Sequence, residues 1–166
     1  MTAAGITIRE ARADEYDRIA DLTIVAYRAT GDAKAADYEH ELRSVAERAA
    51  SCPILVAVDA GGRVVGSVTY VGGPGSPFAE LERDGEAGFR MLAVAPEAQG
   101  RGVGRALAEA VVARARAEGR SGIAIYTRPS MTTAHALYGS IGFVRDPPRD
   151  WEFEPGEWLW ALVLAL

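Results

Sequence analysis

Apolar residues follow two different periods along this chain, and each period predicts a different kind of element. A repeat of three to four residues places apolar side chains on one face of a helix, whereas short β-branched runs are typical of strands. Helices are expected over residues 14–29, 35–50, 103–118 and 132–140. Strands are expected over residues 6–8, 54–58, 64–71, 89–94 and 122–127, and a terminal hairpin follows Phe143. The predicted order is β-α-α-β-β-β-α-β-α-β-β, which we interpret as one α+β domain spanning residues 1–166.

Several of these elements carry end signals. Asp14 is the expected N-cap of the first helix, and Gly119 and Gly142 are expected to end two later helices. The residues between the second and third strands contain a Gly-Gly pair, which favours a hairpin. Residues 72–86 start rich in glycine and proline and then become acidic, and they are interpreted as a loop within the domain. The tryptophans of the terminal hairpin are expected to pack on an edge strand, with a homodimer contact as the alternative.

Composition narrows the class of protein. Of the 166 residues, 49% are hydrophobic and 25% are charged, which is ordinary for a globular domain. A charged stretch follows the first residues at once and the C-terminal apolar run is short, so neither a leader nor a membrane span is expected, and a cytoplasmic location is the default. A net charge of −5 argues against a general nucleic-acid binder. With one cysteine, Cys52, and two distant histidines, neither a disulfide nor a metal site is expected.

A glycine-rich turn lies between the strand at 89–94 and the long helix that follows it. Its residues, Gln99 to Gly104, would aim main-chain N–H groups and the positive end of the helix dipole at one point, which suits a phosphate. Side chains at Gly102 or Gly104 would block that approach, and either residue could require a positive φ. Between Gln99 and Arg120 there is also an excess of three positive charges. A plain surface turn is the alternative, and neither the dinucleotide fingerprint nor the Walker pattern fits.

Two linked motifs resemble the GCN5-related N-acetyltransferase superfamily (GNAT). The first is Gln99-x-x-Gly102-x-Gly104 after Val94-Ala95-Pro96, and the second is Ala134-x-x-Leu137-Tyr138-x-x-x-Gly142-Phe143. Together they cover roughly residues 86–146. The resemblance implies a mixed central sheet with helices on both faces, in which two central parallel strands splay apart and an acyl-pantetheine arm lies in the gap.

The same resemblance assigns a cosubstrate, acetyl-CoA, and no metal. Its thioester would lie against the main chain of Leu92, Ala93 and Val94, and its pyrophosphate against Gly100 to Arg105. The residues expected to bind it are Leu92, Ala93, Val94, Gln99, Gly100, Arg101, Gly102, Val103, Gly104, Arg105 and Met131. The implied reaction is direct attack of a primary amine on the thioester, in which holding both reactants together supplies much of the rate.

Proton transfer requires an acid and a base. The resemblance places Tyr138 at the position of the general acid, and a phenol with an ordinary pKa near 10 is protonated at neutral pH. Many relatives carry a base at the position that aligns with Gly88, so Glu86, on the same face of the strand, is the expected substitute, with a plain strand-entry carboxylate as the alternative. Met131 and Tyr126 are further departures from the family pattern, and they weaken any assignment of the acceptor.

The acceptor is expected to be a cationic amine. The acids between the glycine-rich loop and the central strand, Glu80, Glu82, Asp84 and Glu86, would attract it. Tyr27 or Tyr38, on the helices that wall the acceptor pocket in this family, is expected to lie near it. Two other functions stay open, namely a non-catalytic acyl-CoA-binding regulatory module and an acyltransferase that uses a longer acyl-CoA.

Overall fold

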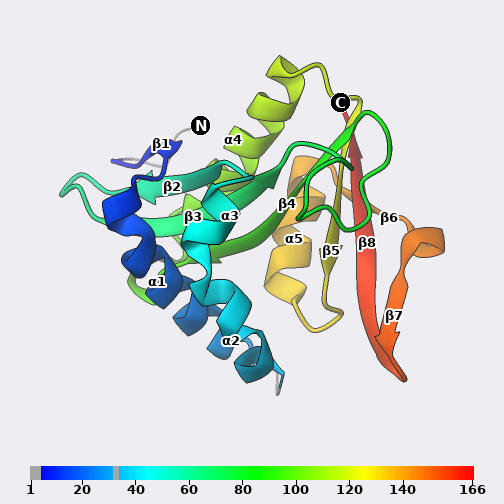
Figure 1. The fold of residues 1–166 in the computed structure, drawn as a ribbon, viewed down its shortest axis with the longest axis horizontal. Helices are drawn as coiled ribbons and strands as arrows, with labels where there is room; N and C mark the ends of the chain where they lie inside the picture. The colour runs from blue at the N-terminus through cyan, green and yellow to red at the C-terminus, as the bar shows by residue number, and fades with distance from the viewer. Residues whose placement is uncertain (1–4, 32–33) are drawn as a thin grey trace.

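The computed structural model describes residues 5–31 and 34–166 and is built around one eight-stranded sheet (Figure 1). The strand order is β1-β2-β3-β4-β5-β8-β6, and β7 pairs with β8. All pairs are antiparallel except β4 with β5. The strands are β1 (Thr7–Glu10), β2 (Ile54–Val58), β3 (Val64–Val71), β4 (Glu86–Val94), β5 (Gly122–Thr127), β6 (Val144–Arg145), β7 (Trp151–Glu154) and β8 (Glu157–Ala165).

Helices cover both faces of the sheet (Figure 1). On one face lie α1 (Tyr16–Arg28), α2 (Ala35–Arg43) and α3 (Val45–Ala49), and on the other lie α4 (Val103–Ala117) and α5 (Thr132–Ile141). The described residues also form the 3-10 turns η1 (Ala13–Glu15), η2 (Pro96–Ala98) and η3 (Pro147–Arg149). Each face has its own apolar core, and together they bury strands β2, β3 and β5 almost completely. The predicted α+β class and mixed sheet are therefore confirmed.

The α4 helix packs unusually close to the sheet. A Cβ added to Gly66 on β3 would lie 2.9 Å from Val103 Cγ1 and 3.0 Å from Leu107 Cδ1. Both of these α4 side chains are buried. A glycine at position 66 is thus what lets the N-terminal turn of α4, and the loop before it, approach the strands.

The parallel strands β4 and β5 separate soon after they meet. The register pairs Glu86 with Gly122 and Ala87 with Ile123, and the two strands then diverge (Figure 1). The confirmed parallel, adjacent pair thus opens a gap beside the rest of β4.

A bulge in β4 lies next to this gap. Across β3, Thr69 pairs with Arg90 and Ser67 with Ala93, so β4 carries one residue more than its partner between these pairs. Met91 adopts a φ of 56°, which is uncommon for a residue other than glycine and is typical of bulges at functional sites. As a result Arg90 and Met91 both face α1 and α2, whereas Leu92 and Val94 pack with the core on the α4 side.

Two sequence predictions about helix ends need correction. The segment predicted as one helix over 35–50 is divided at Ser44, because the buried Arg48 guanidinium donates to the carbonyl oxygens of Glu41 and Leu42 and so ends α2. Asp14 is not an N-cap, since it lies within η1. The carboxylate of Glu15 instead accepts the Arg12 N–H at 2.8 Å. Residues 1–4, on which the expectation of no leader partly rested, lie outside the described residues.

Candidate functional site

The turn between β4 and α4 has the geometry of an anion site. Gly100 and Gly102 adopt φ angles of 73° and 79°, and Gly102 is the N-cap of α4. In the described chain no side chain caps this helix end, so the first N–H groups of α4 remain available. A Cβ at Gly100 would meet nothing within 4 Å. The open main chain and the positive end of a fifteen-residue helix therefore lie together at an exposed turn, which is an arrangement suited to an anion.

Apolar side chains of β4 and α5 lie beside this turn. A Cβ added to Gly104 would lie 3.4 Å from Leu137 Cδ2, 3.6 Å from Val94 Cγ2 and 3.7 Å from Leu92 Cδ2. These side chains are half-buried, so they form a partly open surface between β4, α4 and α5. The φ of Gly104 is not positive, so the backbone conformation does not require glycine there. The missing side chain instead leaves this apolar surface uncovered.

The other residues predicted to bind the cosubstrate differ in how accessible their side chains are. Val103 and Ala93 are buried with their side chains in the two cores, so they can contribute only main-chain groups. Gln99 and Arg101 are exposed at the turn, and Arg105 binds Glu109 at 2.8 Å and Ser140 Oγ at 2.9 Å. Met131, at the start of α5, lines a cavity on the opposite side of the gap.

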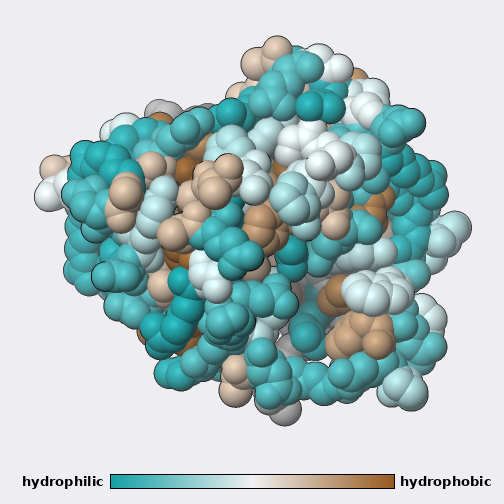
Figure 2. All heavy atoms as spheres, in the orientation of Figure 1, coloured by the Kyte–Doolittle hydropathy of each residue, from teal (hydrophilic) through white to brown (hydrophobic). Residues whose placement is uncertain are grey.

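That cavity has a volume of about 440 Å³ and opens on the face covered by α1 and α2. Figure 2 shows this face hollowed between α2 and the terminal strands. Tyr27 and Tyr38 form one wall, and Tyr126, Trp151 and Phe153 contribute to the other. The remaining lining residues are Thr30, Lys34, Asp37, Glu41, Glu80, Phe89, Arg90, Met91, Thr127, Arg128, Met131, Glu154 and Leu159. Tyr27 and Tyr38 thus both line this cavity, with ring centroids 5.9 Å apart.

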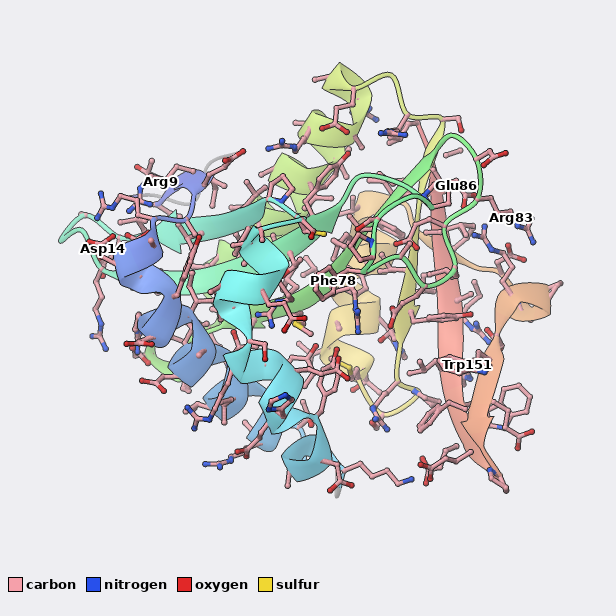
Figure 3. The ribbon with its side chains drawn as sticks, viewed as in Figure 1. Arg9, Asp14, Phe78, Arg83, Glu86 and Trp151 are labelled. Atoms are coloured by element: carbon pink, nitrogen blue, oxygen red, sulfur yellow. The ribbon has the colours of Figure 1, made fainter. Side chains whose placement is uncertain are left out.

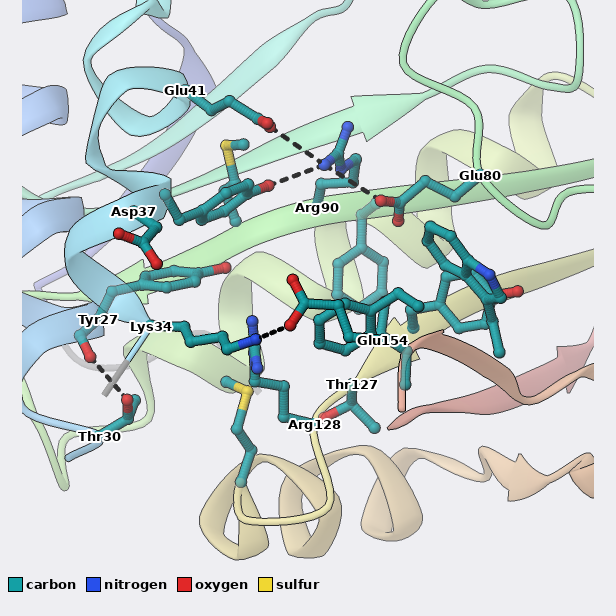
Figure 4. Close-up of a pocket in the computed structure, with 18 residues that line it drawn as sticks. Tyr27, Thr30, Lys34, Asp37, Glu41, Glu80, Arg90, Thr127, Arg128 and Glu154 are labelled. Carbon is teal, nitrogen blue, oxygen red and sulfur yellow. Dashed lines mark hydrogen bonds and ion pairs between the residues drawn. The ribbon is translucent and has the colours of Figure 1, made fainter. Parts of the chain in front are cut away.

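Charged groups in the cavity are largely paired with one another (Figure 4). The Arg90 guanidinium, whose side chain is 16% exposed, lies 3.1 Å from Glu80, 3.7 Å from Glu41 and 2.7 Å from the Tyr38 hydroxyl. Across the cavity, Lys34 pairs with Glu154 of β7. Burial raises the pKa of Glu80 above its usual range, although Arg90 opposes this shift. Glu80 is therefore a carboxylate whose protonation is tuned inside the cavity.

Tyr138 lies beneath the cavity. Its ring packs against Phe89 and Phe143, with centroid distances of 5.5 and 5.8 Å, and Phe89 also lines the cavity. Burial raises the pKa of Tyr138, and the Tyr27 phenol on the cavity wall adds a smaller increase. The hydroxyl group is thus protonated at neutral pH, and Tyr138 reaches the cavity only through Phe89, since it is not itself among the lining residues.

The position of Glu86 argues against the predicted base role. Its two carboxylate oxygens bind the Arg149 guanidinium at 3.0 and 2.7 Å, and it also accepts the Arg83 N–H. These hydrogen bonds, above all those from Arg149, lower the pKa of Glu86. It lies at the paired end of β4, outside the cavity lining and far from Trp151 (Figure 3). Glu86 is therefore a structural ion pair that holds the acidic loop and η3 to β4.

Glu82 takes the place that a side chain at Gly88 would occupy. A Cβ added to Gly88 would overlap Glu82 Oε1 and lie 2.8 Å from the Ala124 carbonyl oxygen on β5. The other carboxylate oxygen of Glu82 accepts the N–H groups of Glu80 at 2.7 Å and Leu81 at 3.1 Å. Glu82 thus fastens the loop over the fork of β4 and β5 and fixes the backbone that carries Glu80. In the sequence, Gly88 was only a departure from the family pattern. In the structure, its missing side chain leaves the space that the Glu82 carboxylate occupies.

Of the four acids expected to attract a cationic acceptor, the cavity lining includes Glu80 alone. The sequence also gave no sign that Arg90 of β4 would meet Trp151 and Phe153 of β7 there, since the two strands are far apart in the chain. Because side chains alternate between the two faces of a strand, the sequence could have placed Arg90 on the same face of β4 as Gly88. No comparable pattern indicated where the tryptophans lie. The tryptophans were expected on an edge strand, but Trp160 belongs to β8, which lies between β5 and β6, and its ring stacks on His135 with centroids 5.5 Å apart. Trp151 instead lines the cavity.

Across residues 5–31 and 34–166, no group of three or more His, Cys, Asp or Glu side chains is placed to hold a metal ion. No helix in the described part of the chain has the length and apolar character needed to cross a membrane.

Comparisons with known proteins agree with this architecture. The chain is similar over its whole length to a GCN5-related N-acetyltransferase from Kribbella flavida, with a TM-score of 0.70, 22% identity, and 99% and 100% of the two chains covered. An acetyltransferase from Salmonella typhimurium, solved with its cofactor acetyl-CoA, gives a TM-score of 0.69 at 22% identity, with 98% and 95% covered. At these identities the likeness concerns the fold.

Among curated proteins, a mycothiol acetyltransferase from Pseudarthrobacter chlorophenolicus is 37% identical over 95 residues, or 55% of this chain. The match spans only 27% of that relative's length. The sequence model of the acetyltransferase (GNAT) family matches residues 16–143, which include β4, the glycine turn, α4, β5 and α5. The chain therefore belongs to the acetyltransferase (GNAT) family.

Proposed function

We propose that this protein transfers an acetyl group from acetyl-CoA to a primary amine by direct attack. The observation that carries the proposal is the pair of sites on opposite faces of the sheet at the fork of β4 and β5. The uncapped α4 turn and the apolar surface beside it lie on one face, and the charged, aromatic cavity lies on the other. A thioester in the gap would meet an amine from the cavity, and this proximity accounts for much of the expected rate.

In this proposal the diphosphate of CoA binds the N–H groups of Gly100 to Arg105. The pantetheine arm of CoA follows the apolar surface of Leu92 and Val94. The bulge at Met91 interrupts the ladder with β3, and the fork removes the partner on the other side. A main-chain N–H there can donate to the thioester oxygen as negative charge develops on it. The positive φ of Met91 thus accompanies the bulge that would free this N–H group from the sheet.

The proton balance assigns two side chains. The bound ammonium gives one proton to Glu80, and the neutral amine attacks the thioester carbon, so that a C–N bond forms and the C–S bond breaks. The departing sulfur takes a proton from Tyr138, and the second proton of the former ammonium restores Tyr138 through solvent. Glu80 releases its proton to water, so one proton is lost per turnover. We assign the base to Glu80 rather than Glu86, because Glu80 lines the cavity and has a raised pKa.

The partial relatives support acetyl transfer, and one of them is named for mycothiol. The alternatives are a non-catalytic acyl-CoA-binding module and an acyltransferase for longer chains. Acyl-CoA thioesters of increasing chain length, compared by their kcat/KM, distinguish the last of these from acetyl transfer.

The test is a panel of amines with acetyl-CoA in which released thiol is measured for wild type, Tyr138→Phe and Glu80→Gln. Tyr138→Phe keeps the ring packing and deletes only the donor, so CoA affinity should hold while kcat falls by about 10²-fold. Unchanged kcat in Tyr138→Phe, when chemistry limits the rate, would show that Tyr138 only packs. Binding of CoA without turnover of any amine would favour the regulatory module.

A further inference from the structure

The lining of the cavity carries information about the acceptor beyond its amine group. Six of the eighteen lining residues are aromatic, and they come from both sides of the opening. On the β7 side, Trp151 lies 6.2 Å from Tyr126 and 6.1 Å from Phe153, measured between ring centroids. Trp151 is 50% exposed although it faces a cavity, so an incoming ring can bury it. Lys34 and Arg128 already lie over the Phe153 ring, 5.7 and 5.2 Å from its centroid, so the half-exposed Trp151 provides the face for stacking.

The charges of the lining favour one ammonium group over several. It contains four carboxylates, at Asp37, Glu41, Glu80 and Glu154, against three cations, at Lys34, Arg90 and Arg128. Glu41 and Glu80 share Arg90, and Glu154 pairs with Lys34. A polyamine would need a row of unpaired carboxylates, because each ammonium that loses its water must gain a partner. This nearly balanced set suits a single amine placed next to Glu80.

From these observations, and resting on the proposed function, we propose that the acceptor is a small primary amine on an aromatic body. Its amine lies by Glu80 at the fork, and its ring lies between the tyrosines of α1 and α2 and the β7 rings. The cavity volume of about 440 Å³ lies within the range of small-molecule sites. Polyamines and sugar-based polycations are excluded by the same argument.

The test is calorimetric titration of the protein saturated with CoA, using phenethylamine, propylamine and spermidine as probes. Phenethylamine should bind most tightly. Trp151→Leu should weaken its binding by roughly 2- to 12-fold, the value of one aromatic pair, and leave propylamine unchanged. Trp158→Leu is the matched control, because Trp158 lies on the adjoining strand, is 43% exposed and does not line the cavity.

Two results would overturn this inference. One is spermidine or propylamine binding as tightly as phenethylamine, and the other is an equal effect of the two tryptophan substitutions. A preliminary titration with CoA alone separates the two levels of the argument. Failure of CoA to bind would overturn the proposed function, whereas CoA binding with the wrong order of amines would overturn only the aromatic acceptor.

Discussion

Replacing Gly88 with alanine tests how the acidic loop is fixed over the fork. The new methyl group would overlap the carboxylate of Glu82 and lie 2.8 Å from the carbonyl oxygen of Ala124. The Glu82 side chain can swing away, but it then gives up its hydrogen bonds to the N–H groups of Glu80 and Leu81. The Ala124 oxygen belongs to the main chain of β5 and can move only with the strand.

The magnitude follows from these contacts. Overpacking by one methyl group typically costs about 1–3 kcal/mol, and each lost hydrogen bond costs about 1 kcal/mol, although solvent recovers part of that. We therefore expect Gly88→Ala to lower the free energy of unfolding by about 1–3 kcal/mol, or Tm by roughly 2–12 °C. Because Glu80 loses its support, kcat/KM for the acceptor should fall by more than the affinity for CoA.

Urea denaturation and steady-state kinetics of four proteins would measure this: wild type, Gly88→Ala, Glu82→Ala and the double variant. Since the methyl group and the carboxylate compete for the same space, the double variant should be more stable than the sum of the single effects predicts. Stability of Gly88→Ala within about 0.5 kcal/mol of wild type, or strictly additive effects, would refute the reasoning.

Two further predictions concern stability. Gly66→Val should cost about 1–3 kcal/mol in urea denaturation, because its Cβ would lie 2.9 Å from Val103 and 3.0 Å from Leu107; a neutral result would mean that α4 can shift freely. The ion pair with Arg9 lowers the pKa of Glu15 from 4.5 to about 2. The stability that it gives is present above pH 4.5 and is lost as pH falls toward 2, so Glu15→Gln should flatten this part of the profile, and an unchanged acid slope would contradict it.

Local signals in the sequence were enough for much of the fold. The hairpin of β2 and β3, the parallel pair β4 and β5, and the caps at Gly119 and Gly142 all depend on short-range periodicity or on glycine, and the structure contains them. The glycine turn could also be predicted from the sequence. The positive φ of Gly102 and the uncapped start of α4 both depend only on residues that are close together in the chain.

The features that escaped prediction arise from contacts between distant segments. The bulge at Met91, for example, depends on the register with β3. The division at Ser44 is a local exception, since Arg48 bonds to carbonyl oxygens only six and seven residues away, but the apolar periodicity gives no sign of it. Glu86 looked like a base in sequence because its partner Arg149 lies 63 residues away. The cavity gathers side chains from α1, α2, β4, β5 and β7, so its composition required the fold.

The central claim is that a polyphosphate-bearing acyl donor binds the α4 turn, and CoA titration of Gly102→Asp tests it most directly. Gly119→Asp is the matched control, since Gly119 follows the other end of α4 with a similar φ of 71° and open space around it. A carboxylate placed against a diphosphate should reduce CoA affinity by at least about 100-fold, whereas the control should bind like wild type. Wild-type affinity for CoA in a folded Gly102→Asp protein would contradict the account.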